Sequence, residues 1–262
     1  MEAEPKSVDL FIKQLKEELG VQASIIEQSA VVAKILIDSA SLLIKFYNSL
    51  HFNVKHVEEP FRGLRQIHID EDLFLERNKV IMARLGAALG LAHRIYARST
   101  NLVRINKEEA LSFQKEHHLQ VPLPGKYRYG LLCGEVLMAI AVFSGGRKMR
   151  DTAPEYRSFE LLRCCNRSGY LVVGGLSKLL KGLVNAYQPG DIMTYIDRDW
   201  SSGANYEKLG FRSEGFVPPQ HFMVNVTDHI RYHVGRADQP MDPSVSRLWV
   251  ENLGSIKMRQ VL

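Results

Sequence analysis

The chain has 262 residues, of which 45% are hydrophobic and 24% are charged, with a formal net charge of +5. That length and apolar content allow one large or two small globular domains with a real core. The three cysteines, Cys133, Cys164 and Cys165, exclude a disulfide framework, and no His/Cys spacing of a zinc site is present, so we expect a reducing, cytoplasmic setting and no metal. No apolar run approaches the roughly 20 residues of a membrane span, and the polar, acidic N-terminus is unlike a signal peptide.

The first third of the chain alternates between helix and strand patterns. Residues 8–19 carry apolar side chains at helical spacing and end at Gly20, which predicts an amphipathic helix. Residues 29–37 and 41–47 are rich in apolar and β-branched side chains, which indicates two buried strands, or one strand and a helix. Residues 63–74 predict a strand that leads into an acidic helix start, and the helix continues over residues 76–89.

The stretch Ile67-His68-Ile69-Asp70 before this helix resembles the end of the Vsr-like or homing-endonuclease-like PD-(D/E)XK nuclease domains. Such nucleases need clustered carboxylates that hold a divalent metal ion beside the scissile phosphate. Asp38 stands where the first aspartate of that pattern falls, but Lys45 stands where the family has a glutamate, and a lysine cannot act as that ligand. The resemblance implies a degenerate nuclease-like α/β domain over residues 20–92, without cleavage activity. A plain α/β packing module is the alternative.

The next elements supply two candidate functional features. We predict a strand over residues 96–105, a helix over 107–117 capped by Asn106, and a hairpin over 127–143 that turns at Gly134. His118, at the end of the helix, is a candidate base because the unperturbed pKa of histidine is near neutrality, or else it satisfies the helix C-terminus. A basic loop follows, which either tracks phosphate or is solvated without a partner; its cations are Arg147, Lys148 and Arg150.

Residues 159–211 contain the pattern that most strongly indicates a function. A strand over residues 159–165 is followed by the pair Gly174-Gly175, a helix, a second strand over 191–196 and a short helical segment. Glycines before a helix let a ligand approach the backbone, and the amides of the first helical turn attract phosphate. Lys178 adds a positive charge there. Taken alone, the glycine pair also fits a tight turn between packed elements.

This order of elements, ending in Tyr206-Glu207-Lys208-Leu209-Gly210-Phe211, resembles the GNAT acyltransferases over about residues 95–234. The resemblance implies an α/β fold with a GNAT-like mixed central sheet and flanking helices, and acetyl-CoA or another acyl-CoA as cofactor. It implies that Tyr206 protonates the departing CoA thiolate, although a buried core tyrosine would leave the same pattern. It also implies that the cofactor pyrophosphate rests on a turn made of Val172, Val173, Gly174, Gly175, Leu176, Ser177 and Lys178.

Three stretches resemble, more closely, the GNAT-like, Mom-related domains of phage proteins: residues 160–166, 172–179 and 197–203. Mom modifies adenine in DNA and so helps the DNA evade restriction. The resemblance implies a phage or prophage origin within a bacterial host, and a DNA nucleobase as the acceptor. Asp197 or His118 would then be the base and Trp200 would stack an extruded base, unless Trp200 is a rim aromatic that seals the core. The other implied DNA contacts are Ser201, Arg163, Arg147, Lys148 and Arg150.

The end of the chain predicts strands but no further chemistry. Residues 214–217, 221–226 and 230–233 have strand character, and the tail 237–262 either packs as a helix or mediates self-association, such as a homodimer. The predicted organisation is an N-terminal helix (1–19), the nuclease-like domain (20–92), the acyltransferase-like domain (93–236) and the tail (237–262). Two other functions stay open: a non-catalytic DNA-binding accessory protein, and an acyltransferase for a protein, a tRNA or a small amine.

Overall fold

The computed structural model describes residues 7–149, 153–235 and 246–262. By its internal contacts the chain divides into two units. Unit 1 comprises Met1–Met82, Asp197–Ser202 and Phe216–Ser255, and unit 2 comprises Ala83–Ile196, Gly203–Gly215 and Ile256–Leu262. Each unit thus combines three separate stretches of sequence, and the predicted mixed α/β class is confirmed. Within the described ranges, no helix has the length and apolar character needed to cross a membrane.

Unit 1 contains a four-stranded sheet in the order β1-β2-β3-β5. The strands β1, β2 and β3 form an antiparallel meander, and β5 pairs with β3 in parallel. The two apolar runs expected to be strands are β2 and β3, separated by the short 3-10 turn η1. The bounds are β1 Ser24–Gln28, β2 Val32–Ile37, η1 Asp38–Ala40, β3 Leu42–Tyr47 and β5 Arg65–Asp70.

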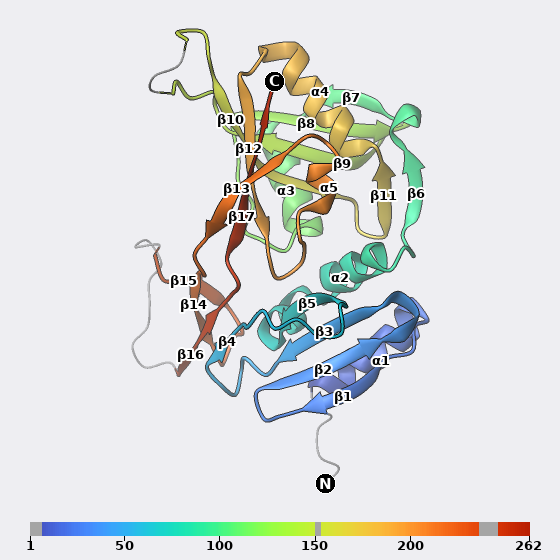
Figure 1. Cartoon of the computed structure of the whole chain (residues 1–262). Helices are drawn as coiled ribbons and strands as arrows, with labels where there is room; N and C mark the ends of the chain where they lie inside the picture. The colour runs from blue at the N-terminus through green and yellow to red at the C-terminus, as the bar shows by residue number, and fades with distance from the viewer. Residues whose placement is uncertain (1–6, 150–152, 236–245) are drawn as a thin grey trace. The chain divides into compact units, whose positions relative to one another are not determined.

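Both faces of this sheet are covered, because all six residues of β3 are buried. On one face, Phe46 packs against Phe11 of helix α1 (Ser7–Leu19) and Phe74 of helix α2 (Glu71–Ala88), with ring centroids 5.1 to 5.6 Å apart. Tyr47 points to the opposite face, since successive side chains of a strand alternate. The predicted amphipathic helix and the acidic helix start are therefore confirmed (Figure 1).

A second sheet in unit 1 has the order β15-β14-β16-β4. It packs through Val224 and Val250, which form a buried cluster with Tyr47, Leu50 and Val54. Of the two alternatives for the tail, the packed helix is wrong, because the described part of the tail forms strands β16 and β17, whereas self-association stays a prediction. Val250 pairs with Val54 of β4 and is fully buried. The bounds in this sheet are β4 Val54–Lys55, β14 His221–Asn225, β15 Arg231–His233 and β16 Arg247–Glu251, whereas β17 (Ser255–Val261) pairs in the sheet of unit 2.

Unit 2 is built on a seven-stranded sheet in the order β13-β17-β12-β10-β9-β8-β7 (Figure 1). The strand predicted over residues 96–105 is two strands in different sheets, because the 3-10 turn η2 (Ala97–Ser99) separates β6, which pairs with β11, from β7. The hairpin at Gly134 is confirmed. The bounds are β6 His93–Tyr96, β7 Asn101–Arg104, β8 Tyr127–Cys133, β9 Val136–Phe143, β10 Ser158–Asn166, β11 Tyr170–Val173, β12 Asp191–Asp197 and β13 Arg212–Val217.

Two helices cover opposite faces of this sheet. Alternate residues of β9 enter different clusters: Ala141 and Phe143 lie with helix α4 (Gly175–Tyr187), whereas Ile140 and Val142 lie with helix α3 (Lys107–His117). The predicted cap of α3 is confirmed, since the Asn106 side chain accepts from the Glu109 amide and the Glu109 carboxylate accepts from the Asn106 amide. A short helix, α5 (Ala204–Glu207), follows β12. The sheet is thus covered by α4 on one side and α3 on the other.

The packing of α1 leads to a stability prediction. Phe11 is fully buried between Phe46 and Phe74, so Phe11→Ala should lower the free energy of unfolding by about 3–5 kcal/mol through lost burial and a residual cavity. Urea denaturation followed by circular dichroism would measure this change. Lys13→Ala on the exposed side of the same helix is the matched control and should change stability by less than about 0.5 kcal/mol. A loss below about 1 kcal/mol for Phe11→Ala would contradict the packing described.

Candidate functional site

The parallel strands β10 and β12 of unit 2 separate before they end. Their paired residues run from Ser158↔Asp191 to Leu161↔Thr194, yet β10 continues to Asn166 and β12 to Asp197. A β-bulge in β10, between Leu161 and Arg163, lies at the point where the pairing stops. Bulges bend a strand and are frequent beside active sites. Beyond the bulge, the edge of β10 that faced β12 can pair with an extended ligand.

Helix α4 begins at the same end of the strand pair. The connection from α4 to β12 passes beside the start of β10, where the Gly190 amide donates to the Arg157 carbonyl at 2.9 Å. The beginning of α4 therefore lies at the carboxyl ends of the two strands, where parallel α/β sheets bind their ligands. This arrangement places a helix N-terminus and a diverging strand pair at one edge of the sheet.

The turn that opens α4 requires glycine at two positions for two reasons. Gly174 is the N-cap and has φ +76°, which L side chains rarely adopt. A Cβ on Gly175 would lie 3.0 Å from Cβ of Val172 and 3.3 Å from Leu131, so Gly175 allows close packing. The first intrahelical bond runs from the Lys178 amide to the Gly174 carbonyl, so the amides of Gly175, Leu176 and Ser177 precede it and are placed for an anion.

The sequence suggests that the ammonium group of Lys178 adds positive charge at this turn, but in the structure that group is bound to backbone carbonyls. Its Nζ donates to the carbonyls of Ala97 (2.8 Å) and Thr100. The ammonium group therefore ties α4 to the turn η2, and the anion-binding capacity of the turn comes from the backbone.

Tyr206 of helix α5 is a half-buried tyrosine of unit 2. Its ring packs edge-on against Phe211 at 5.6 Å, within the main cluster of the sheet. Burial raises the pKa of its phenol, with a further increase from the neighbouring Cys164 thiol of β10. Cys164 lies beyond the last β10–β12 pair, so the phenol lies near the strand segment where β10 and β12 have separated. A phenol with a raised pKa stays protonated at neutral pH and can act as an acid.

The other predicted site residues of unit 2 have local partners. His118 is the C-cap of α3, and its Nδ1 accepts from the Gln120 amide at 3.0 Å. Arg163 donates from Nε and Nη2 to the Val121 carbonyl, and Arg147 forms an ion pair of 2.7 Å with Glu160. Lys148 is exposed. Arg150 lies outside the described residues. These arginines contribute to local structure, whatever further contacts they make.

Three predicted residues belong to the stretch of unit 1 that follows β12. The Asp197 carboxylate accepts from the Asp199 amide at 3.0 Å, and the Asp197 carbonyl accepts from the amides of Trp200 and Ser201. These bonds form a compact turn. Trp200 is 6% exposed, so a base could stack on it only after the side chain had moved.

The two residues tested against the nuclease pattern do not form a carboxylate centre. Asp38 is exposed in η1, at the end of the β2–β3 hairpin. Lys45 is buried in the middle of β3, where its Nζ donates to the Val57 carbonyl at 2.8 Å and burial lowers its pKa. Asp38 and Lys45 therefore do not form a metal centre with each other, and the nuclease-like domain stays a prediction.

Sequence reasoning missed a buried polar network on the Tyr47 face of the first sheet. His56 lies between two carboxylates, with Nε2 2.8 Å from Asp70 and Nδ1 2.8 Å from Asp199. Arg231 of β15 donates to Asp70 and to both oxygens of Asp72 at 2.6 to 2.9 Å. No sequence motif of fixed spacing contains these residues, because they come from distant parts of the chain.

The charges in this network shift the pKa values of its members. Burial alone would lower the pKa of His56, but Asp70 and Asp199 raise it to about 10. Burial lowers the pKa of His68 to about 3, helped by the charge on His56. Burial would raise the pKa of Asp70, but His56 and Arg231 hold it below its usual value. The network therefore contains ionised carboxylates beside a neutral His68.

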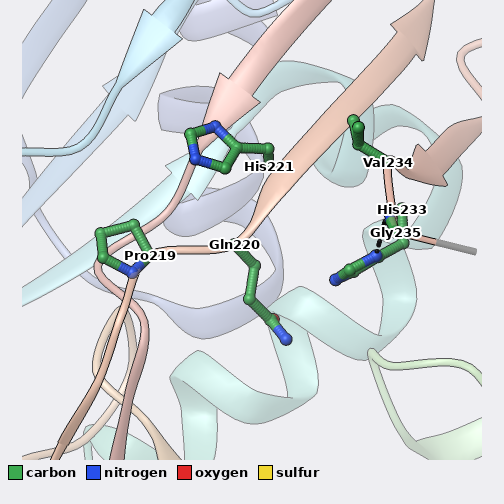
Figure 2. Close-up of a pocket in the computed structure, with 6 residues that line it drawn as sticks. All are labelled: Pro219, Gln220, His221, His233, Val234 and Gly235. Carbon is green, nitrogen blue, oxygen red and sulfur yellow. Dashed lines mark hydrogen bonds between the residues drawn. The ribbon is translucent and has the colours of Figure 1, made fainter.

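A shallow pocket of about 310 Å³ lies elsewhere in unit 1 (Figure 2). It is formed around β14 and β15 by Pro219, Gln220, His221, His233, Val234 and Gly235. The His233 ring is fixed by the Gly235 amide, which donates to Nδ1 at 3.0 Å. None of the residues predicted to carry chemistry lines this pocket.

Comparisons with known proteins find acetyltransferases. No family model and no curated protein matches the sequence. Among solved structures, a histone acetyltransferase HPA2 and related acetyltransferase from Corynebacterium glutamicum is 12% identical and covers 62% of this chain and 96% of its own, with a TM-score of 0.38. A GNAT family acetyltransferase from Elizabethkingia anophelis with acetyl-CoA bound is 10% identical. It covers 63% of this chain and 99% of its own, with a TM-score of 0.35. Naa50 of Arabidopsis thaliana, in complex with a bisubstrate analogue, is 8% identical. It covers 63% of this chain and 99% of its own, with a TM-score of 0.38.

The environment of Cys164 gives a prediction on thiol reactivity. Burial raises the pKa of the Cys164 thiol to about 12, so almost no reactive thiolate forms at pH 8. In the folded protein, iodoacetamide should alkylate Cys164 at least about 100-fold more slowly than in urea-unfolded protein. Peptide mass spectrometry after timed quenching measures both rates at the same residue. Equal rates in the two states would show that the thiol is not held in an apolar environment.

Proposed function

We propose that the chain transfers an acyl group from an acyl-CoA, acetyl-CoA or another, to an amine, and that unit 2 binds the cofactor. The observation that carries this proposal is the separation of β10 from β12 beyond Leu161↔Thr194, at the edge where α4 begins. An elongated ligand with amides at its centre and phosphates at one end fits such an edge. CoA has this form, since its pantetheine arm contains two amides and leads to a pyrophosphate.

The residues present fit the two polar parts of this cofactor. The amides of Gly175, Leu176 and Ser177 would hold the pyrophosphate, assisted by the positive end of the α4 dipole. The absence of a side chain at Gly174 lets a ligand approach the backbone closely. The edge of β10 beyond the bulge would pair with the pantetheine amides as an added strand does. An acyl-CoA supplies an activated thioester, and the protein supplies orientation.

Tyr206 would act as the general acid of the transfer. Its phenol is near Cys164 on the separated part of β10, and its raised pKa keeps the proton on the oxygen at neutral pH. A proton delivered to the sulfur completes thiol departure while the acceptor amine loses its proton to a base. Asp197 and His118 are the two candidates for that base.

For the acceptor, we propose an amino group of a DNA nucleobase, as in the Mom-related phage proteins that residues 160–166, 172–179 and 197–203 resemble. The net charge of +5 and the pI of about 9.0 are compatible with this partner. The first third of the chain would then be a nuclease-derived module that contributes to DNA binding and no longer cleaves. A protein, a tRNA and a small amine are the other acceptors that the experiment below separates.

Gly174 tests the cofactor site. Gly174→Val should weaken CoA binding at least about tenfold, because the side chain obstructs the backbone and strains a residue at φ +76°. Isothermal titration calorimetry with CoA measures this affinity. Gly134→Val is the matched control, since Gly134 also has positive φ (+58°) and open space around its Cβ but lies in the β8–β9 hairpin. Retained CoA affinity in Gly174→Val would remove this turn from the site.

Tyr206 tests the chemistry and the acceptor together. We would digest DNA and RNA from cells that express the protein and measure the nucleosides by mass spectrometry. A heavier nucleoside is expected with the native protein and with the control Tyr170→Phe, whose exposed tyrosine lies on β11. The Tyr206→Phe variant should lower its amount at least about tenfold through loss of the acid, with little change in CoA affinity.

The outcomes separate the alternatives. A new nucleoside in DNA supports the proposed acceptor, and its mass identifies the transferred group. A new nucleoside in RNA alone indicates a tRNA acceptor. No new nucleoside from a folded protein that binds CoA indicates a protein or small-amine acceptor, and failure to bind CoA leaves the non-catalytic DNA-binding protein as the remaining reading.

A further inference from the structure

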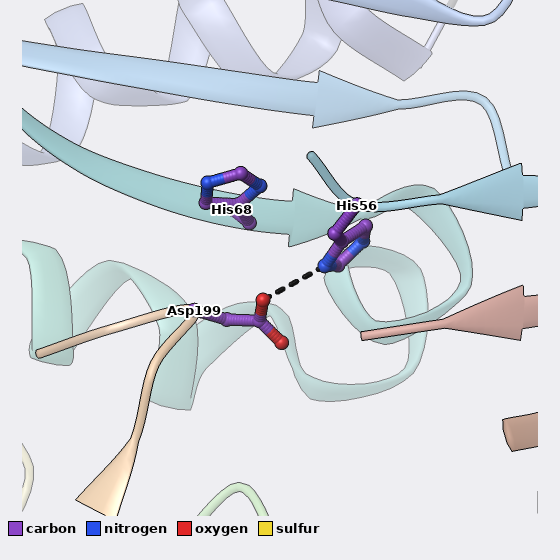
Figure 3. A group of neighbouring side chains, drawn as sticks. All are labelled: His56, His68 and Asp199. Atoms are coloured by element: carbon purple, nitrogen blue, oxygen red, sulfur yellow. Dashed lines mark hydrogen bonds and ion pairs between the residues drawn. The ribbon is translucent and has the colours of Figure 1, made fainter. Parts of the chain in front are cut away.

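We propose that His56, His68 and Asp199 of unit 1 form a binding site for a divalent transition-metal ion, with Zn²⁺ as its occupant. One potential ligand atom from each residue lies within 4.8 Å of the other two. The three side chains come from the segment after β4, from β5 and from the turn that follows β12, and they are neighbours in Figure 3. Two imidazoles and one carboxylate are a donor set that zinc accepts.

Backbone hydrogen bonds hold the three residues in place. The His68 amide donates to the Asp199 carbonyl at 2.9 Å, which joins β5 directly to the turn that carries Asp199. The His56 amide donates to the Glu251 carbonyl at 2.8 Å and so extends the pairing of β4 with β16. His68 lies on β5, and these two bonds tie the segments that carry Asp199 and His56 to the strands β5 and β16, which gives the rigid support that a preformed metal site requires.

Each histidine also has the partner that metal ligands usually have at the second nitrogen. His56 donates from Nε2 to Asp70 at 2.8 Å, and this leaves Nδ1 facing Asp199. His68 is hydrogen-bonded through Nδ1 to the Tyr47 hydroxyl at 2.9 Å, and this leaves Nε2 for an ion. Such carboxylate and hydroxyl partners fix the tautomer and the orientation of a ligating imidazole.

The distances are close to those of a bound ion. Ligands about 2.0–2.1 Å from a tetrahedral ion lie roughly 3.3 Å from one another. His56 Nδ1 and Asp199 Oδ1 are 2.8 Å apart, and the three potential ligand atoms all lie within 4.8 Å of one another. Shifts of about 0.5 to 1.5 Å would therefore complete the site, with the ion in the position of the hydrogen between His56 and Asp199.

The charges of the buried network also favour a dication. The hydrogen-bonded network contains three carboxylates, Asp70, Asp72 and Asp199, and one arginine, Arg231. Ligation requires both imidazoles to be neutral, so the ion displaces the proton that Asp70 and Asp199 hold on His56, and a dication then brings this set to zero net charge. Buried charges are costly unless they are balanced. All three proposed ligands are less than 8% exposed, so this balance matters.

The two imidazole ligands also determine which metal ion the proposed site prefers. Mg²⁺ and Ca²⁺ prefer oxygen ligands, whereas Zn²⁺ and its first-row neighbours bind imidazole. The site should therefore bind Zn²⁺ and ignore millimolar Mg²⁺. Three protein ligands leave one position of a tetrahedral ion for water.

The test is Zn²⁺ binding by the full chain without a polyhistidine tag. Protein treated with chelator and then desalted would be equilibrated with ZnCl₂, and bound zinc measured by plasma mass spectrometry. We expect one saturable Zn²⁺ per chain, a higher melting temperature with zinc, and no competition from Mg²⁺. His68→Gln and Asp199→Asn should lower the affinity at least about 100-fold. Tyr47→Phe, which keeps the core packing, should lower it about tenfold or more through the freed His68 ring.

The matched control is the double variant His221→Gln, His233→Gln, which removes two histidines of the open pocket and should leave the affinity unchanged. If a ligand variant fails to fold, Tyr47→Phe and visible absorption of the Co²⁺-loaded native protein decide the question, because tetrahedral Co²⁺ absorbs strongly. The proposal is overturned by the absence of saturable zinc, by equal affinity in native protein and Tyr47→Phe, by loss of zinc in the control, or by equal competition from Mg²⁺.

Discussion

Unit 1 depends on the pairing of charges that its fold has buried. Arg231 of β15 reaches Asp70 and Asp72 at the end of the first sheet, and His56 joins Asp70 to Asp199. These contacts connect all three stretches of sequence from which unit 1 is assembled. Removing one partner of a buried pair leaves an uncompensated charge, which typically costs about 3–5 kcal/mol. The stretch 197–202 therefore belongs to unit 1 because of where its carboxylate is satisfied, although the strand before it belongs to the sheet of unit 2.

Unit 2 depends on a different constraint, the bulge in β10. β10 pairs with β12 from Ser158 to Leu161 and with β9 from Leu161 to Asn166, so the two pairings meet at Leu161. After the bulge only the β9 side continues. A strand edge within a sheet needs partners for its amides and carbonyls, so the separation of β10 from β12 is a structural cost that a bound ligand would offset. The same edge holds the glycine turn of α4, and the proposed cofactor site depends on this coincidence.

The features that could be predicted from the sequence are those that depend on adjacent residues. The capping box of α3, the glycine hairpin at Gly134 and the turn at Gly174 each depend on a few adjacent residues, and the pattern of each was sufficient. The split between β6 and β7 was missed because η2 contains no glycine or proline to mark it. Strand β16 was missed because its partners, Val54 and Val224, are distant in sequence. The His56 network shares that cause, since no spacing rule links a residue near the N-terminus to Asp199. The roles given to Tyr206, Asp197 and His118 stay predictions.

The cations of unit 2 decide how a phosphate would be held there. Lys178 is bound to the carbonyls of Ala97 and Thr100, and Arg163 to the Val121 carbonyl. Each of these two side chains therefore donates to backbone carbonyls, and neither charge is reserved for an anion. Whatever affinity the glycine turn has for pyrophosphate must then come mainly from amides and from the helix dipole, whose attraction is short-ranged and confined to the first turn. Such a site recognises shape as much as charge, because amides fixed by the turn reach only a phosphate that approaches Gly174 closely. Gly174 meets this requirement because it has no side chain and adopts φ +76°.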